Sequence, residues 1–247
     1  MSPQNDYHQP DLLKGTRKKL AFDIEIAKEL PDDFNDFKAH RPLGISCAAA
    51  LTDEGELTIW HGGKWDEKFT EKMTETEVIE MIDYLWSMVQ AGFQIYTWNG
   101  LGFDLDILFE ESGGDERCKL MARSHVDMMF HFFCIKGYAI SLDKASRGMG
   151  LEGKTEGMDG ALAPKMWREG KYNQVLSYVS QDVRVTLGLA QQCDRKKQVR
   201  WTSNRGRDQV CMLPNGWLLV EQALKLPEPD TSWMSTPWPR SKFTGWL

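Results

Sequence analysis

The sequence has little cysteine and no long apolar run. Its five cysteines are odd in number and widely spaced, and none forms a Cys-x-x-Cys pair. This excludes an evident disulfide framework or zinc site and fits a reducing compartment, so we expect a cytoplasmic protein. Residues 1–19 lack an apolar signal core, and runs such as residues 45–51 are far too short to span a membrane. We therefore expect no membrane partner.

The chain also lacks an excess of positive charge. It carries 30 Lys and Arg against 36 Asp and Glu, a formal net charge of −6. This balance argues against a broad electrostatic grip on nucleic acid, although a local one stays open. At 247 residues the chain is long enough to bury a substantial core as one large or two small domains.

An unusual pair of carboxylates occurs early in the chain, within residues 19–26. Side chains of a strand alternate between two faces, so Asp23 and Glu25 share one face. The opposite face is apolar and consists of Leu20, Phe22, Ile24 and Ile26. Neighbouring carboxylates on a buried strand repel each other unless a cation lies between them, which favours a divalent metal. A solvated edge strand is the ordinary alternative.

The following segments predict an α/β arrangement. Residues 44–50 and 57–60 read as strands that continue residues 19–26 as a meander. Thr74 with Glu77 predicts a capped helix that ends near Gly92. A short strand is expected at residues 94–98, followed by a helix over residues 103–110. Asp104 then lies in the first turn of that helix, where a plain capping role is an alternative to catalysis.

The second half contains the longest expected helix, over residues 171–193. Its apolar residues recur at helical spacing, and Tyr178 and Asp182 are four residues apart on one face. A Tyr–Asp hydrogen bond would be an adequate structural reason for that pair. Residues 126–135 mix polar and apolar side chains and leave strand and helix both open.

The composition changes after Asp194. Six basic residues fall within residues 195–207, and the chain beyond Pro214 is rich in Trp and Pro. Because disordered segments are poor in aromatic residues, we expect an ordered extension packed on the domain. Docking of a protein partner on this Trp/Pro-rich region is the alternative.

Three motifs in order resemble the DEDD superfamily of 3′ to 5′ exonucleases, in its tyrosine subclass. They are FDIE at residues 22–25, WNGLGFD at residues 98–104 and YVSQD at residues 178–182. The chain looks most like stand-alone relatives of the proofreading exonuclease domain of family B DNA polymerases. The resemblance implies a ribonuclease H-like α/β fold, with a mixed central sheet of about five strands flanked by helices and a C-terminal Trp-rich extension. The expected divisions are an N-terminal lead-in (1–17), the exonuclease domain (18–194) and the extension (195–247).

The resemblance also implies a chemistry. Asp23, Glu25 and Asp182 would hold one Mg²⁺, and Asp23 with Asp104 a second, with Mn²⁺ as a substitute. Tyr178 would orient the attacking water. The expected substrate is the 3′ end of single-stranded or frayed DNA, cut to nucleoside 5′-monophosphates, with a role in DNA repair or replication.

Substrate contacts follow from the same resemblance. Ile24 would wedge near the last base, and Asn99 and Phe103 would meet the terminal nucleotides. Apart from the resemblance, the charges of Lys154 and of the basic run over residues 195–207 could meet phosphates, with a solvated charged face as the alternative. A core position for Phe103 and a turn position for Asn99 are equally compatible with the sequence. The alternative functions are a 3′ to 5′ exoribonuclease and a binding module of the same fold without catalysis.

Overall fold

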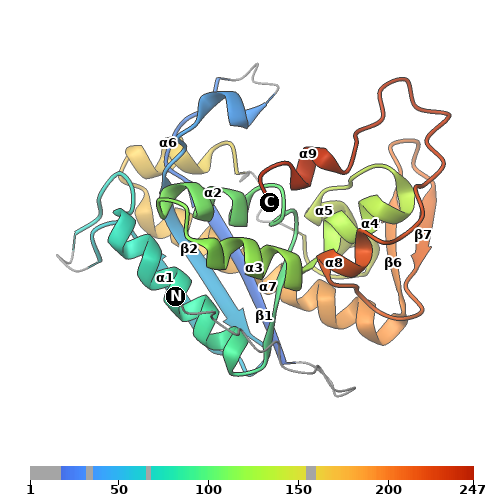
Figure 1. The fold of residues 1–247 in the computed structure, drawn as a ribbon, viewed down its shortest axis with the longest axis horizontal. Helices are drawn as coiled ribbons and strands as arrows, with labels where there is room; N and C mark the ends of the chain where they lie inside the picture. The colour runs from blue at the N-terminus through green and yellow to red at the C-terminus, as the bar shows by residue number, and fades with distance from the viewer. Residues whose placement is uncertain (1–17, 32–35, 65–67, 154–159) are drawn as a thin grey trace, which may run out of the picture.

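A five-stranded mixed sheet lies at the centre of the computed structural model, which describes residues 18–31, 36–64, 68–153 and 160–247 (Figure 1). The strand order is β3-β2-β1-β4-β5, with β1 in the middle. The first three strands form an antiparallel meander, and β4 and β5 add in parallel on the other side of β1. The strands are β1 (Lys18–Ile26), β2 (Ile45–Thr52), β3 (Leu57–His61), β4 (Phe93–Thr97) and β5 (Val126–Asp127). The expected mixed five-stranded sheet is confirmed.

Helices cover both faces of this sheet (Figure 1). One face carries α1 (Glu75–Gln90), α2 (Asp104–Glu111) and α3 (Glu116–Ser124). The opposite face carries α6 (Ala163–Arg168) and α7 (Tyr172–Lys196). The remaining short elements are η1 (Phe37–His40), α4 (Met128–Lys136), α5 (Leu142–Gly148), α8 (Val220–Ala223) and α9 (Ser241–Thr244).

The alternation expected for β1 divides the core into two layers. The row of Leu20, Phe22, Ile24 and Ile26 belongs to the cluster that α1, α2 and α3 complete. On the other face, Ala21 packs with Val175, Val179 and Val183 of α7. Asp23 and Glu25 therefore point to the α7 side of the sheet.

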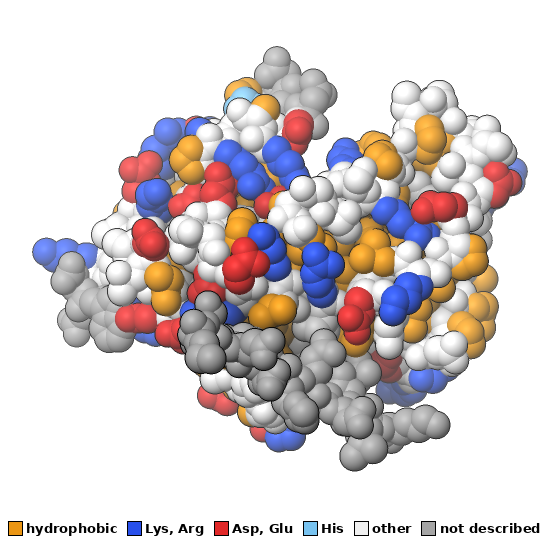
Figure 2. Space-filling model, viewed as in Figure 1, with side chains coloured by type: hydrophobic (Ala, Val, Ile, Leu, Met, Phe, Trp, Pro, Cys, Tyr) orange, Lys and Arg blue, Asp and Glu red, His pale blue; other side chains and the backbone are white. Residues whose placement is uncertain are grey.

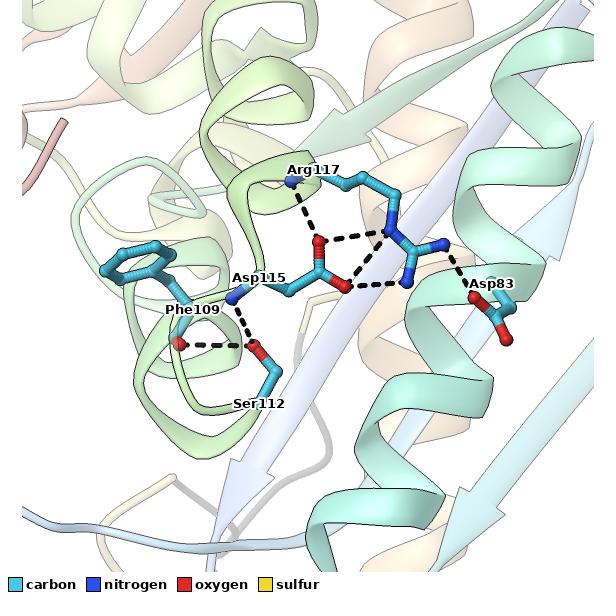
Figure 3. A network of polar contacts seen from close by, with 5 residues as sticks. All are labelled: Asp83, Phe109, Ser112, Asp115 and Arg117. Carbon is cyan, nitrogen blue, oxygen red and sulfur yellow. Dashed lines mark hydrogen bonds and ion pairs between the residues drawn. The ribbon is translucent and has the colours of Figure 1, made fainter. Parts of the chain in front are cut away.

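Capping interactions define the starts of the helices on the first face. Thr74 caps α1 as expected: its Oγ1 accepts from the backbone N–H of Glu77, and the Glu77 carboxylate accepts from the N–H of Thr74. At α3, the Asp115 carboxylate accepts from the N–H of Arg117 and pairs with its guanidinium, which extends to Asp83 of α1 (Figure 3). This network ties α3 to α1.

Residues 126–136 contain both of the structures that the sequence left open. Asp127 ends β5, and its carboxylate caps α4 by accepting from the N–H of Phe130 at 2.9 Å. Every residue of α4 from Met128 to Cys134 is buried. A helix buried all round has no polar face, which is why its periodicity was not visible in the sequence.

The chain beyond α7 is ordered and packs on the domain. The hairpin of β6 (Gln198–Thr202) and β7 (Asp208–Met212) is followed by a tail whose Trp217 and Leu219 share a core cluster with Val199 and Trp201. Phe243 of α9 contacts the rings of Phe130 and Phe133. The tail thus contributes to the central core. Among the described residues, the helices are all too short or too polar to cross a bilayer.

His131 links α4 to this tail. Its Nδ1 accepts the backbone N–H of Leu218 at 3.2 Å, and its side chain is 3% exposed. Burial lowers the pKa of His131 from 6.5 to about 4. The neutral ring is therefore the form that the folded state requires.

Acidification should weaken the fold through His131. Below pH 6.5 the unfolded chain protonates this imidazole while the folded chain does not, so the free energy of unfolding falls as the pH drops toward 4. Between pH 6 and 4.5 we expect a loss of about 2 kcal/mol, at about 1.4 kcal/mol per pH unit. Urea unfolding at both pH values measures it.

His131→Asn is the matched variant, because an amide oxygen still accepts from Leu218 but does not titrate. Its loss between the two pH values should be smaller than that of the wild type by about the same 2 kcal/mol. Equal losses in the two proteins would contradict this assignment. Other titrating groups are present in both and cancel in the comparison.

Candidate metal centre

Three carboxylates from two elements meet beside the centre of the sheet. Asp23 and Glu25 come from β1 and Asp182 from α7, and one oxygen of each lies within 4.8 Å of the others. Glu25 and Asp182 are buried, and Asp23 is half-buried. Carboxylates this close in a shielded position repel one another, and the cluster could hold a metal ion between them.

Small neighbours leave room beside these carboxylates. In the β1–β2 register, Asp23 lies opposite Ala49 and Glu25 opposite Cys47. Both small residues also pack against α7, which lets the helix come close to the sheet. Burial, together with the charges of Glu25 and Asp23, raises the pKa of the Cys47 thiol well above its usual value. The thiol therefore stays protonated next to the acidic cluster.

Asp104 reaches the same region from the other side of β1. It is 2% exposed in the first turn of α2, and its Oδ1 accepts the backbone N–H of Ile24 at 3.0 Å. Asp104 is thereby held at the backbone between Asp23 and Glu25. Its oxygens are not among the three that lie within 4.8 Å of one another.

Tyr178 lies one helical turn before Asp182 on α7 and is 2% exposed. The four-residue spacing places both side chains on the helix face that packs on the sheet. The structure thus brings the three carboxylates together and places Asp104 and Tyr178 on the elements adjoining them. Whether these residues act in catalysis remains a prediction.

The loop before α2 has a specific conformation. Asn99 has φ +80°, a left-handed conformation that asparagine tolerates better than most residues. A Cβ at Gly100 would lie 2.4 Å from the Thr97 hydroxyl, and one at Gly102 would lie 2.9 Å from the Phe243 ring. The two glycines therefore let this loop pack tightly against β4 and the C-terminal tail.

Asp127 fixes this loop and was not identified from the sequence. Its carboxylate accepts the backbone N–H groups of Asn99 and Leu101 at 3.0 and 2.9 Å, besides capping α4. Burial raises the pKa of Asp127, opposed by His125 and by these hydrogen bonds. The only sequence signal was its place just before a helix, because its partners in the loop lie more than 25 residues away.

A cleft of about 830 Å³ opens beside the acidic cluster. Asp23 and Asp182 line it together with Trp98 and Asn99. Its other walls come from residues 36–38, 139–142 and 241–243 and from Gly102, Met129 and Trp238. The surface is hollowed between the segment of η1 and that of α9, at the top of the view in Figure 2. A ligand in this cleft would contact two of the three carboxylates.

The residues expected to contact substrate have different surroundings. Asn99 is half-buried and lines the cleft. Phe103 is half-buried with its ring edge-on to Phe37 at 5.1 Å. The Ile24 side chain is 3% exposed and belongs to the core row of β1. The Ile24 backbone N–H donates to Asp104. The predicted contact of Ile24 with the last base stays a prediction. Lys154 lies outside the described residues.

The donor set fits a hard divalent cation. All the ligand atoms offered are carboxylate oxygens, which Mg²⁺ and Mn²⁺ accept, and the cleft leaves space for the waters that Mg²⁺ keeps. Asp23, Glu25 and Asp182 would hold such an ion. The fold and this cluster together define an α/β protein with a candidate metal centre on its central strand.

Comparisons with known proteins assign the chain to a superfamily. The RNase_H superfamily model matches residues 67–193, about half of the chain, and the chain belongs to this superfamily. The structure of the family B DNA polymerase from the hyperthermophilic archaeon Pyrobaculum calidifontis is similar, with a TM-score of 0.52 and 19% identity over 72% of this chain. The chain covers 25% of that polymerase, so the likeness concerns part of a longer protein and shows the fold alone. No curated protein matches the sequence.

Metal binding should stabilise the folded protein. At a metal concentration of 100 times Kd, a cation that binds only the folded state adds about 2.7 kcal/mol, which raises the Tm of a chain of this size by about 5 to 10 °C. Thermal unfolding with and without MnCl₂ measures this shift. In Asp182→Asn we expect the shift to be lost.

Asp106→Asn is the matched control. Asp106 is a buried aspartate outside the cluster, paired with Lys38 and Arg41. Its variant should keep the Mn²⁺-induced shift even if its own Tm is lower. A shift of the same size in Asp182→Asn and the wild type would exclude the cluster as the metal site.

Proposed function

We propose that this chain is a metal-dependent 3′ to 5′ exonuclease acting on single-stranded or frayed DNA ends. The observation that carries this proposal is the convergence of Asp23, Glu25 and Asp182 beside a cleft that Asp23 and Asp182 line, with Asp104 hydrogen-bonded to the backbone of Ile24. Membership of the RNase_H superfamily supports a nuclease. The similarity in fold to part of a DNA polymerase also supports the proposal of a nuclease that acts on DNA.

The residues divide the chemistry between them. Asp23, Glu25 and Asp182 would hold one ion, and Asp23 with Asp104 the second. Bound divalent cations would activate the attacking water and neutralise charge on the scissile phosphate and the departing 3′ oxygen. Tyr178 would orient that water through its hydroxyl. The water oxygen would bond to phosphorus and lose a proton to solvent, and the bond from phosphorus to the 3′ oxygen would break. The 3′ oxygen would take up a proton to become the new 3′ hydroxyl, and a nucleoside 5′-monophosphate would leave.

Digestion of a 5′-labelled oligomer tests this function directly. With Mg²⁺ or Mn²⁺, the wild type should shorten single-stranded DNA stepwise from the 3′ end, and a blocked 3′ end should prevent it. The Asp104→Ala, Asp182→Ala double variant should be slower by about a thousandfold, because lost metal ligands forfeit several kcal/mol of transition-state stabilisation. Equal rates for the two proteins would refute the enzyme proposal.

The same assay with an RNA oligomer of equal sequence decides whether the enzyme prefers DNA or RNA. The proposed preference is for DNA, so the DNA ladder should appear faster. Faster shortening of RNA would replace the proposed substrate with RNA while leaving the exonuclease assignment intact. The carboxylates contact phosphate through metal and do not read the sugar, so this choice depends on other cleft residues.

Tyr178→Phe tests the positioning of water. Removing the hydroxyl should lower kcat by about a hundredfold with little change in KM, because the contact is made in the reaction and not in substrate binding. Tyr172→Phe is the matched control, since Tyr172 lies on the same helix and packs its ring on Phe69 and Trp167. An unchanged kcat in Tyr178→Phe would exclude the role.

A further inference from the structure

The C-terminal tail forms one wall of the cleft beside the acidic cluster. Trp238, Ser241, Lys242 and Phe243 line the cleft that also contains Asp23 and Asp182. These tail residues lie outside residues 67–193, which match the superfamily. The wall they form is therefore a feature of this chain beyond the matched region.

Two aromatic side chains of this wall have different surroundings. Phe243 is 4% exposed and packs on Phe130 and Phe133, so it anchors the tail in the core. Trp238 is 48% exposed, with its ring centroid 6.3 Å from that of Phe243. Since Phe243 already provides the anchor, core packing does not account for the large exposed indole of Trp238 in the cleft.

A cation accompanies this exposed indole. The Lys242 ammonium lies 3.4 Å from the centroid of the Trp238 ring, which is within cation–π range. Within the described part of the chain, Lys242 forms no ion pair with an acidic side chain. Lys38, which also lines the cleft, is paired with Asp106 at 3.0 Å. The charge of Lys242 is thus more available to a ligand than that of Lys38.

The charge of the cleft makes such a cation useful. Asp23, Asp36 and Asp182 all line it. A bound metal would offset the charges of Asp23 and Asp182, but Asp36 would still repel a chain of phosphates that enters the cleft. Lys242, which lines the same cleft, offsets this repulsion. Proteins bind single-stranded nucleic acid by combining aromatic rings that stack on bases with cations that contact the backbone. Because the Lys242 ammonium lies over one face of the Trp238 ring, a base would stack on the other face.

We propose that Trp238 stacks on a base of a single DNA strand lying in the cleft, and that Lys242 contacts a phosphate of the same strand. The proposal rests on the proposed exonuclease function, since it places the strand with its 3′ end at the acidic cluster. Trp238 and Lys242 are binding residues in this arrangement and take no part in bond breaking.

Fluorescence anisotropy of a 5′-fluorescein (dT)₁₂ oligomer tests the stacking. Ca²⁺ replaces Mg²⁺ and Mn²⁺ in this binding assay so that the oligomer is not digested. Trp238→Ala should raise Kd by about tenfold, and Trp238→Phe by much less, because a smaller ring still stacks. The same oligomer with abasic residues over its 3′ half should bind the wild type more weakly and be insensitive to Trp238→Ala. Trp233→Ala is the matched control, an exposed tail tryptophan absent from the cleft lining.

Lys242→Ala tests the phosphate contact. It should weaken binding of intact and abasic oligomers alike, and it should reduce the slope of log Kd against log salt by about 0.7, the value for one phosphate of a single strand. An unchanged slope would exclude the contact.

The outcomes separate this proposal from the proposed function. If Trp238→Ala leaves Kd unchanged, or weakens intact and abasic oligomers equally, stacking is refuted even when the wild type digests DNA. If the wild type binds (dT)₁₂ with the expected Trp238 dependence but digests no oligomer, the exonuclease assignment is wrong and the binding site stands. If the wild type does not bind the oligomer, the proposal is refuted.

Discussion

The close packing of α7 on β1 and β2 is the contact on which the candidate metal centre depends. Val175, Val179 and Val183 of the helix meet the small side chains Ala21, Cys47 and Ala49 of the two strands. This apolar contact holds Asp182 against Asp23 and Glu25 in spite of their mutual repulsion. The hydrophobic contact thus offsets part of the repulsion among the three carboxylates.

A second set of contacts converges on the loop that leads into α2. Asp127 accepts the N–H groups of Asn99 and Leu101, while the indole of Trp246 donates to the Leu101 carbonyl at 2.7 Å. Phe243 packs against Gly102 in the same loop. The tail and the strand β5 therefore hold the segment that presents Asp104, which makes the C-terminal region part of the support of the candidate site.

The negative net charge of the protein is compatible with the proposed binding of DNA. A formal charge of −6 argues against binding DNA over a broad surface. A local arrangement of bound cations, Lys242 and an exposed indole requires no such surface, because its contacts are short-range and confined to one cleft. The salt dependence of binding should accordingly be that of a few phosphate contacts.

The sequence alone determined features that depend on local spacing. The two faces of β1 follow from the alternation of side chains along a strand. The shared face of Tyr178 and Asp182 follows from the helical repeat, and the start of α1 follows from the capping pair of Thr74 and Glu77. The motifs and their order also allowed the fold to be recognised through a resemblance. The helix α4 could not be predicted from periodicity because it is buried all round and has no polar face.

Only the tertiary structure decided which of these residues meet. The approach of Asp182 to Asp23 and Glu25, and the hydrogen bond between Asp104 and the Ile24 backbone, join residues that lie on separate elements. The same holds for Asp127 and for Trp238 at the cleft wall. Such contacts arise from the packing of whole elements, which no local repeat in the sequence encodes.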